Sequence, residues 1–501
     1  MAETIWQLLH ACDDAAIALS APDRLPLDYA GLKEQVTSTA ATLTARGVTQ
    51  GDAVGIVLPN GPEMASAFLS VACSATAAPL NPNYTADEFA FYLTDLEAKA
   101  VIVMDGVDTP ARDVARAECM AVLEIQVADG APAGRFTIEG QSDGVAPQSS
   151  ADDTALVLHT SGTTSRPKIV PLSQRNVSAS AQHIRDTLAL TSGDRCLNIM
   201  PLFHIHGLIA VIMASTAAGA SVYCTPGFNA MKVFSWMETA EPTWYSAVPT
   251  MHQAILARAA RNTEIIERLG LRFVRSSSAS LPPQVMAELE DTFGCPVIEA
   301  YGMTEAAHQM ASNPLPPAGR KAGSVGLAAG PEVAIMNEDG ALLERGAKGE
   351  VVIRGPNVTA GYRNNEKANA EAFTGGWFRT GDQGVIDADG YLTITGRLKE
   401  IINRGGEKVS PREVDDVLMD HPAVAQVVTF ALPHDKLGEE VAAAIVLKDG
   451  ETAEPKEIAS FASERLAAFK VPRKLVIIDE IPKGATGKLQ RIGLAEKLGL
   501  A

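Results

Sequence analysis

Strand-like and helix-like segments alternate along residues 29–300, and this alternation limits the fold more than any other feature of the chain. Apolar runs bounded by turn residues predict strands at 53–58, 100–104, 196–200, 221–224, 243–246, 272–275 and 297–300. Helical periodicity occurs between them, for example at 31–46 and 65–74. Strands separated by helices pair in parallel, because the chain crosses back before each new strand. We therefore predict an α/β fold with a large N-terminal unit of parallel or mixed sheets. Residues 105–152 show little periodicity and are predicted to be a loop-rich connection.

The later part of the chain has a different pattern. Short strands at 333–336 and 349–354, separated by glycine-containing turns, predict a small β subdomain at about 325–396. A helix is predicted to start at Ser410-Pro-Arg-Glu413, which reads as a capping box with proline at the first helical position. Strands at 424–432, 441–447 and 475–478 and a helix at 455–468 complete an α+β unit of ordinary domain size. We predict an N-terminal domain at 1–396 and a smaller, mobile C-terminal domain at 397–501.

Composition argues against several classes of partner. The chain has 501 residues, of which 46% are hydrophobic and 20% are charged, and it is too long for a single core. Its formal net charge of -18 argues against nucleic acid or an anionic membrane as the main partner, since both need a basic surface. The six cysteines have no metal-ligand spacing, and the N-terminus lacks the basic region of a signal peptide. A cytoplasmic location is therefore predicted.

One uncharged stretch, residues 207–224, is nearly long enough to cross a bilayer. Gly219 divides it into a helix-like part and a strand-like part, and several serine and threonine side chains interrupt it. We predict a buried helix followed by a strand.

A loop rich in hydroxyl groups follows the apolar run at 154–158 and ends at Lys168. Gly162 lets the backbone approach an anion closely, and the lysine supplies a positive charge for a phosphate tail. The hydroxyl donors are Thr160, Ser161, Thr163 and Thr164. The loop lacks the spacing G-x-x-x-x-G-K-[ST], which argues against a P-loop NTPase. The alternative is a solvated turn between a strand and a helix that starts near Arg175.

This loop resembles the T-S-G-T-T-x-x-P-K motif of the adenylate-forming enzymes, a family of acyl-CoA synthetases, luciferases and peptide-synthetase adenylation domains. Further motifs follow in the family's order, namely Tyr301-Gly-Met-Thr-Glu305, Trp377-Phe-Arg-Thr-Gly-Asp382 with Gly396-Arg397, and Pro482-Lys-Gly-Ala-Thr-Gly-Lys488. The resemblance covers nearly the whole chain, and Gly484 is a mild departure from it. It implies that a carboxylate and MgATP form an acyl-adenylate and pyrophosphate. The thiol of CoA then attacks the adenylate to give a thioester and AMP.

The resemblance implies roles for individual residues of the nucleotide site. Tyr301 would stack on adenine, Thr304 would donate to a phosphate, and Glu305 would hold Mg²⁺. Asp382, in a turn, and Arg397 would contact the ribose. Taken alone, each motif also fits a simpler structure, such as a turn that ends in a surface glutamate.

Lys488 would be the adenylation lysine, because a flexible ammonium group can reach the charge that develops between the carboxylate and the α-phosphate. A lysine near a C-terminus is otherwise usually solvated. In the family the small domain closes for the first step and rotates for the second, and Lys399 occupies the hinge position. Gly405 and Gly406 resemble the segment that lines the CoA tunnel, with a plain turn as the alternative. His204 resembles the family's gating aromatic or histidine.

Polar residues in the acyl region indicate the class of acid. Ser277 and Ser278 stand where the family commonly has glycines, and His206 and His308 stand where many relatives have apolar, small or aromatic residues. Against an alkyl tail these groups would be unpaired, at a cost of roughly 1–3 kcal/mol each. A second carboxylate would pair with them and draw at least one histidine toward its charged form. The alternative is hydrogen bonding of these side chains within the core.

These segments, together with Ser165-Arg166 in the phosphate loop, resemble the oxalate-CoA ligases of plants and fungi. The prediction is a very short dicarboxylate, oxalate first, with Ser278 and His308 at its distal carboxylate and His206 in the same pocket. One alternative is a ligase for medium-chain, long-chain or aryl acids. Another is a non-catalytic adenylate-binding sensor, which would not need both Glu305 and Lys488. The predicted partners are ATP, CoA, the acid and Mg²⁺, and the oligomeric state is left open between monomer and homodimer.

Overall fold

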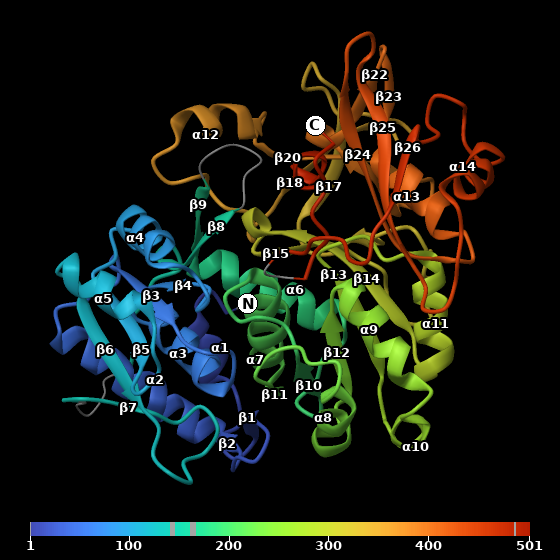
Figure 1. The fold of residues 1–501 in the computed structure, drawn as a ribbon. Coiled ribbons are helices and arrows are strands. Elements are labelled where there is room, and N and C mark those ends of the chain that lie inside the picture. Colours follow the sequence, from blue (N-terminus) through green and yellow to red (C-terminus); the bar gives the residue numbers. More distant parts are fainter. Residues whose placement is uncertain (1, 141–145, 161–166, 485–486, 501) are drawn as a thin grey trace.

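Two large sheets form the N-terminal part of the protein (Figure 1). The computed structural model describes residues 2–140, 146–160, 167–484 and 487–500. The seven-stranded sheet has the order β7 (Thr137–Ile138), β6 (Ala121–Gln126), β5 (Ala100–Met104), β3 (Ala53–Val57), β4 (Thr76–Pro79), β8 (Thr154–Thr160), β9 (Lys168–Ser173). The nine-stranded sheet has the order β16 (Leu327–Ala328), β15 (His308–Ser312), β14 (Val297–Met303), β13 (Phe273–Ser277), β12 (Trp244–Ala247), β10 (Arg195–Asn198), β11 (Ser221–Cys224), β1 (Ile17–Ser20), β2 (Leu27–Asp28).

The predicted parallel pairing is confirmed in both sheets. β3 pairs in parallel with β4 and β5, and β10, β12, β13 and β14 follow one another in parallel. Two antiparallel hairpins, β8–β9 and β14–β15, extend these parallel cores. These two hairpins carry several of the predicted site residues, including Thr160, Lys168, Tyr301 and His308.

Helices pack on and between the sheets. They are α1 (Ile5–His10), α2 (Tyr29–Ala45), α3 (Pro62–Ala72), α4 (Ala86–Asp95), α5 (Pro110–Ala117), α6 (Gln174–Thr187), α7 (Ala214–Ala218), α8 (Val233–Ala240), α9 (Pro249–Ala259), α10 (Thr263–Ile266), α11 (Pro283–Phe293), the short helix η2 (Thr304–Ala306) and α12 (Glu366–Ala372). Every residue of α3 is buried, and the helix contacts β4 and β8 of one sheet and β11 of the other. Its small and apolar side chains on all faces allow it to fill this position.

The prediction of a loop-rich connection at 105–152 is wrong in part. The region contains α5 and the strands β6 and β7, and β6 pairs in parallel with β5. The helix starts at Pro110 after the N-cap Thr109, but only Ala111 and Ala115 are buried along it. The helix is only eight residues long and its buried side chains are small, so its apolar face stands out little from the surrounding sequence.

The stretch at 207–224 is a buried helix followed by a strand, as predicted. A π-helical segment, η1 (His206–Met213), leads into α7, and Gly219 ends the helix with φ 66° before β11 begins. No helix in the part of the chain that the structure describes has both the length and the apolarity needed to span a membrane.

A small antiparallel sheet follows the nine-stranded one. It consists of β17 (Glu332–Met336), β18 (Lys348–Arg354), β20 (Trp377–Ile386) and β19 (Phe373–Thr374), with β21 (Leu392–Arg397) also paired to β20. Asp382 therefore lies within the strand β20 rather than in the predicted turn, because Gly381 with φ 74° lets the strand bend without ending.

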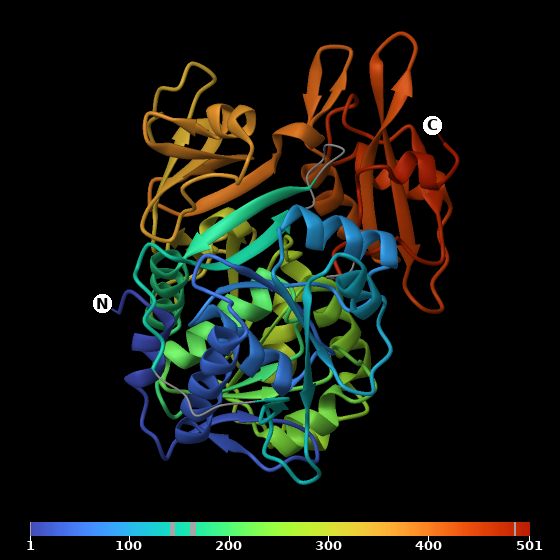
Figure 2. The same ribbon diagram turned by 90° about the vertical axis from the view of Figure 1, so that its left-hand side faces the viewer.

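The C-terminal part has its own sheet and core. Its elements are η3 (Leu398–Glu400), β22 (Ile402–Arg404), β23 (Glu407–Val409), α13 (Pro411–Met419), β24 (Val424–His434), β25 (Gly438–Leu447), α14 (Pro455–Ser463), β26 (Lys474–Ile477) and α15 (Leu494–Lys497). Figure 2 shows this part, in orange and red, above the N-terminal sheets. The predicted capping box at Ser410 is wrong. Ser410 is the N-cap of α13, but its hydroxyl donates to the carbonyl of Thr395 instead of capping the helix.

Candidate active site

The strands that carry the predicted nucleotide residues end close together. Thr160, the last residue of β8, is paired with Lys168, the first residue of β9. Lys168 Nζ lies 4.3 Å from the centroid of the Tyr362 ring. β9 also contacts η2, which carries Glu305. The remaining phosphate-loop residues that we predicted lie outside the described residues, namely Ser161, Gly162, Thr163 and Thr164.

Glu305 is a buried carboxylate beside this hairpin. Its side chain accepts a hydrogen bond of 2.8 Å from the Tyr362 hydroxyl, and the residue is only 6% exposed. Burial raises the pKa of Glu305, and the charges of Arg397 and Lys168 oppose that shift. Thr304 precedes it at the start of η2. The carboxylate therefore lies near two cations that would also attract phosphate groups.

A tight turn joins β14 to β15 and positions both Glu305 and His308. A Cβ at Gly302 would lie 1.8 Å from the carbonyl oxygen of His308, so a side chain is excluded there. Ala307 and His308 have φ values of 45° and 96°, a left-handed conformation that costs a residue with a side chain of the order of 1 kcal/mol or more. One hairpin thus places a carboxylate in the predicted nucleotide site and an imidazole in the predicted acyl region.

The predicted ribose residues form a hydrogen-bonded group. Asp382 and Arg397 are directly opposed on β20 and β21, and Arg397 Nε donates to Asp382 Oδ1 at 3.0 Å. The Tyr301 hydroxyl donates to the other oxygen, Asp382 Oδ2. Burial, together with the charge of Asp382, raises the pKa of Tyr301 well above its usual value. Asp382 is thus held in one orientation from both sides, which suits an acceptor for two ribose hydroxyls.

Lys488 reaches the same region from the C-terminal sequence. The preceding residue, Gly487, accepts a hydrogen bond of 2.7 Å at its carbonyl from Thr250 Oγ1 on α9. Burial lowers the pKa of Lys488 to about 8, and the charge of Arg397 acts in the same direction while Asp382 opposes it. Lys488 also contributes to the lowered pKa of His204, after the larger effect of burial. The ammonium group therefore lies within electrostatic range of the ribose pair and of the predicted gate.

The predicted acyl residues also come together. His206 and His308 are stacked, with ring centroids 5.1 Å apart and an interplanar angle of 23°. His206 Nδ1 lies 3.0 Å from Ser278 Oγ, whereas Ser277 Oγ donates to the carbonyl of Ala300 at 2.9 Å. Ser278, and not Ser277, is therefore the serine that belongs to this cluster, and its φ of 75° turns it away from the strand.

We did not predict the buried polar residues behind the two imidazoles. Arg275 Nη1 lies 3.3 Å from His308 Nε2, and Ser246 Oγ lies 2.6 Å from His206 Nε2. Burial lowers the pKa of both histidines well below its usual value, and in this ligand-free pocket neither is drawn toward its charged form. The sequence contained only a weak signal, because Arg275 is a charge that directly follows the apolar pair Phe273-Val274 of a predicted strand.

Lys399 and the two glycines predicted for CoA lie apart from these clusters. Lys399 is exposed in η3, directly after β21. Gly405 and Gly406, with φ values of 60° and 96°, form the turn between β22 and β23. Figure 2 shows this hairpin at the end of the C-terminal part that points away from the N-terminal sheets. In this arrangement of the chain, the glycines do not contribute to the region around Lys488.

Glu305 fits a magnesium ion that is shared with a nucleotide. Within the described ranges, no group of three or more histidine, cysteine, aspartate or glutamate side chains could hold a metal by itself. Mg²⁺ commonly binds through one or two carboxylates together with substrate phosphates. A single buried carboxylate close to Lys168 matches that donor set.

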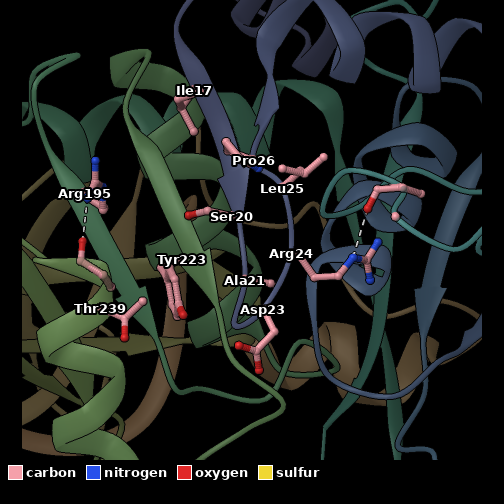
Figure 3. A pocket seen from close by; sticks show the side chains of 13 residues that line it. Ile17, Ser20, Ala21, Asp23, Arg24, Leu25, Pro26, Arg195, Tyr223 and Thr239 are labelled. Atoms are coloured by element: carbon pink, nitrogen blue, oxygen red, sulfur yellow. Dashed lines mark hydrogen bonds between the residues drawn. The ribbon is translucent and has the colours of Figure 1, made fainter.

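A cavity of about 680 Å³ lies elsewhere, beside β1, the segment 21–26 that leads to β2, and Arg195 of β10 (Figure 3). Its two arginines are already engaged, since Arg24 donates to the carbonyl of Ala131 at 3.1 Å and Arg195 donates to that of Ala240 at 2.6 Å. None of the predicted site residues lines this cavity.

Comparison with protein-family models matches residues 9–363 to the AMP-binding enzyme model and residues 413–488 to the C-terminal domain model of AMP-binding enzymes. The chain is 46% identical to oxalate–CoA ligase of Arabidopsis thaliana over 486 residues, which cover 95% of this chain and 94% of the relative. It is 41% identical to oxalate–CoA ligase of Saccharomyces cerevisiae over 481 residues, covering 90% of this chain and 87% of the relative.

A solved structure of MatB from Rhodopseudomonas palustris with bound ATP is also similar. It has a TM-score of 0.90, 30% sequence identity and coverage of 99% of both chains. The apo structure of the same enzyme has a TM-score of 0.81 at the same identity and coverage. Over the whole chain, the structure is therefore more similar to the ATP-bound structure than to the apo structure.

Proposed function

Since this chain belongs to the AMP-binding enzyme family and is an AMP-forming acid–thiol ligase, we propose that its acid is oxalate and its product oxalyl-CoA. The observation that carries this proposal is the buried, stacked pair His206 and His308 with Ser278 beside it. An alkyl or aryl group packed there would leave polar atoms unpaired, at roughly 1–3 kcal/mol each, whereas a second carboxylate would accept from them. Two relatives of this chain with 41% and 46% identity, both named oxalate–CoA ligase, support the same acid.

In the first step, an oxygen of the reacting carboxylate forms a bond to the α-phosphorus of ATP, and pyrophosphate leaves. Lys488 stabilises the negative charge that develops between the carboxylate and the α-phosphate. Tyr301, Asp382 and Arg397 orient the adenosine, so that little reorganisation is needed at the moment of reaction. Phosphate contacts come from Thr304 and Lys168, and from the loop residues Thr160, Ser161, Gly162, Thr163 and Thr164.

A bound Mg²⁺ would supply positive charge that neutralises the phosphates. Glu305 is the residue that would hold it, and the Tyr362 hydroxyl at 2.8 Å keeps one carboxylate oxygen in place. We expect Glu305→Gln to raise the Mg²⁺ concentration needed for half-maximal adenylation. Tyr362→Phe should also raise this Mg²⁺ concentration, but by a smaller factor.

In the second step, the thiolate of CoA attacks the carbonyl carbon of the adenylate and AMP leaves. This step requires a different position of the C-terminal domain, which we assign to residues 397–501, with residues 1–396 as the N-terminal domain. Lys399 is the proposed hinge, Gly405 and Gly406 would line the CoA path after rotation, and His204 would separate the adenylate from the thiol site. We also propose that the enzyme is cytoplasmic and acts as a monomer or homodimer.

The proposal is tested by AMP release in the presence of CoA and MgATP, with oxalate, malonate, acetate, octanoate and 4-coumarate compared under the same conditions. Oxalate should have the highest kcat/KM. A higher value for octanoate or coumarate would keep the family and reaction but reject the acid. Absence of AMP with every acid would favour the adenylate-binding sensor.

A further inference from the structure

Arg275 lies at the centre of the polar cluster behind the acyl residues. It is in the middle of β13, is fully buried, and forms no ion pair with any carboxylate among the residues that the structure describes. Among the described residues, its guanidinium hydrogen-bonds to three neutral groups, namely His308 Nε2 at 3.3 Å, Ser246 Oγ at 3.4 Å and Gln309 Oε1 at 3.3 Å. A buried cation of this kind imposes a direction on every hydrogen bond that it makes, because a guanidinium can only donate.

This constraint assigns the proton of His308. Since Arg275 Nη1 donates to His308 Nε2, that nitrogen must be the acceptor, and the single proton of the neutral imidazole is on Nδ1. Within the described part of the chain, His308 Nδ1 has no hydrogen-bond partner. His308 therefore presents an N–H donor that no group among the described residues accepts.

The same constraint passes through Ser246 to His206. The Ser246 hydroxyl accepts from Arg275 Nη1 and has one hydrogen of its own to donate. Its oxygen lies 2.6 Å from His206 Nε2, the one acceptor within reach of that hydrogen among the described residues. His206 Nε2 is then an acceptor, so the His206 proton is on Nδ1 and donates to Ser278 Oγ at 3.0 Å. The Ser278 hydroxyl is left to donate to a ligand.

The opposite order is unfavourable. If His206 Nε2 carried the proton, Ser246 would receive two donors, and its own hydrogen would have no acceptor among the described residues. Ser246 is fully buried, so an unpaired hydroxyl there would cost of the order of 1–3 kcal/mol.

We propose that Arg275 is a positioning residue that sets His308 and His206 as Nδ1–H tautomers, so that His308 and Ser278 present only hydrogen-bond donors to the acid. This inference rests on the proposed function, because it assigns the acyl pocket to these residues. A pocket of donors next to an uncompensated cation selects a distal group that only accepts hydrogen bonds and carries negative charge. A carboxylate satisfies both conditions, whereas an amide such as that of oxamate brings its own donors and no charge.

The tautomers are measured directly in the ligand-free, full-length protein by long-range ¹H–¹⁵N correlation with ring-labelled histidine. In the wild type, His206 and His308 should both show a protonated Nδ1 and an unprotonated Nε2.

Three variants test which residue sets each tautomer. Ser246→Ala should change the tautomer of His206 and leave the tautomer of His308 unchanged. Arg275→Met should change the tautomers of both histidines, and Arg275→Lys should leave the tautomer of His308 unchanged. His252, which lies 3.4 Å from the Tyr245 hydroxyl, serves as an internal reference. A protonated Nε2 on either wild-type histidine would overturn the proposal, whether or not Arg275→Met folds.

Kinetics separate this role from mere support of the fold. Arg275→Met should raise KM for oxalate at least about tenfold and reduce the preference for oxalate over oxamate, with little change in KM for ATP. Arg275→Lys should recover part of the loss, and the exposed Arg268→Met should behave as wild type. A variant with wild-type tautomers and a wild-type KM for oxalate, but a lower Tm, would show that Arg275 only stabilises the strand. If another acid proves to be the substrate while the tautomers are as stated, only the choice of acid fails.

Discussion

Thr250 Oγ1, on α9, donates a hydrogen bond of 2.7 Å to the carbonyl of Gly487, the residue before Lys488. The two residues are 237 positions apart in the chain, so this contact exists only when the C-terminal part is docked on the N-terminal sheets. Gln253, one turn further along α9, makes a second contact of this kind by donating to the carbonyl of Ala425 at 3.2 Å. The position of Lys488, the proposed adenylation lysine, therefore depends on α9.

Thr250→Val should slow adenylation by about three- to tenfold, since it removes one hydrogen bond worth about 1 kcal/mol from the conformation that adenylates. Thioester formation from supplied acyl-adenylate should be unchanged, because it uses the other domain position. Thr250→Ser keeps the hydroxyl and is the matched control. Equal losses in both half-reactions would mean that the contact supports the fold generally.

The pKa of Lys488 predicts a basic limit to adenylation. Burial lowers that pKa to about 8, so the side chain is charged below pH 8 and loses its charge as the pH rises through that value. We expect kcat/KM for oxalate to fall above about pH 8. Lys488→Arg should be slower, but its kcat/KM should not fall in this pH range, because the guanidinium stays charged. If kcat/KM falls above pH 8 in the same way in both proteins, a group other than Lys488 must cause the fall.

His308→Ala should lower kcat/KM for oxalate by at least about tenfold, equivalent to about 1.4 kcal/mol, and leave the affinity for ATP unchanged. The reason is the loss of the Nδ1–H donor to the distal carboxylate. Steady-state kinetics with each substrate varied in turn measure both effects. An unchanged kcat/KM for oxalate would show that His308 does not contact the acid.

Glu299 predicts a stability effect that depends on pH. It is buried, Oε1 accepts from the Leu281 amide at 3.1 Å, and burial raises its pKa from 4.5 to about 7 against the opposing charge of Arg412. The unfolded chain ionises this group first, so its contribution to stability is complete below about pH 4.5 and declines as the pH rises to about 7.

Glu299→Gln should therefore stabilise the protein at pH 8 by up to about 2 to 3 kcal/mol, and by much less at pH 5. The measurement is Tm of both proteins at the two pH values. Equal Tm differences at pH 5 and pH 8 would contradict the raised pKa. Leu281→Met, which keeps the amide, controls for changes in local packing.

Several outcomes show what local sequence can predict. The strands 221–224 and 297–300 and the helix after Pro411 were located because their apolar periodicity or proline position is visible in a few consecutive residues. The helix Pro110–Ala117 was missed because its buried face consists of alanines. Ser410 was given a capping role that its hydroxyl does not have, since a carbonyl from another strand competes for it.

The sequence by itself determined the family and the α/β class, and it predicted the residues of the nucleotide site, because each motif is a contiguous run of residues. Only the tertiary structure decided how the acyl pocket is built. Arg275, Ser246 and His308 come from three different strands, and they meet because β12, β13, β14 and β15 are adjacent in one sheet. Hydrogen-bond direction depends on distances of about 3 Å between such side chains, and neither periodicity nor spacing along the chain encodes those distances.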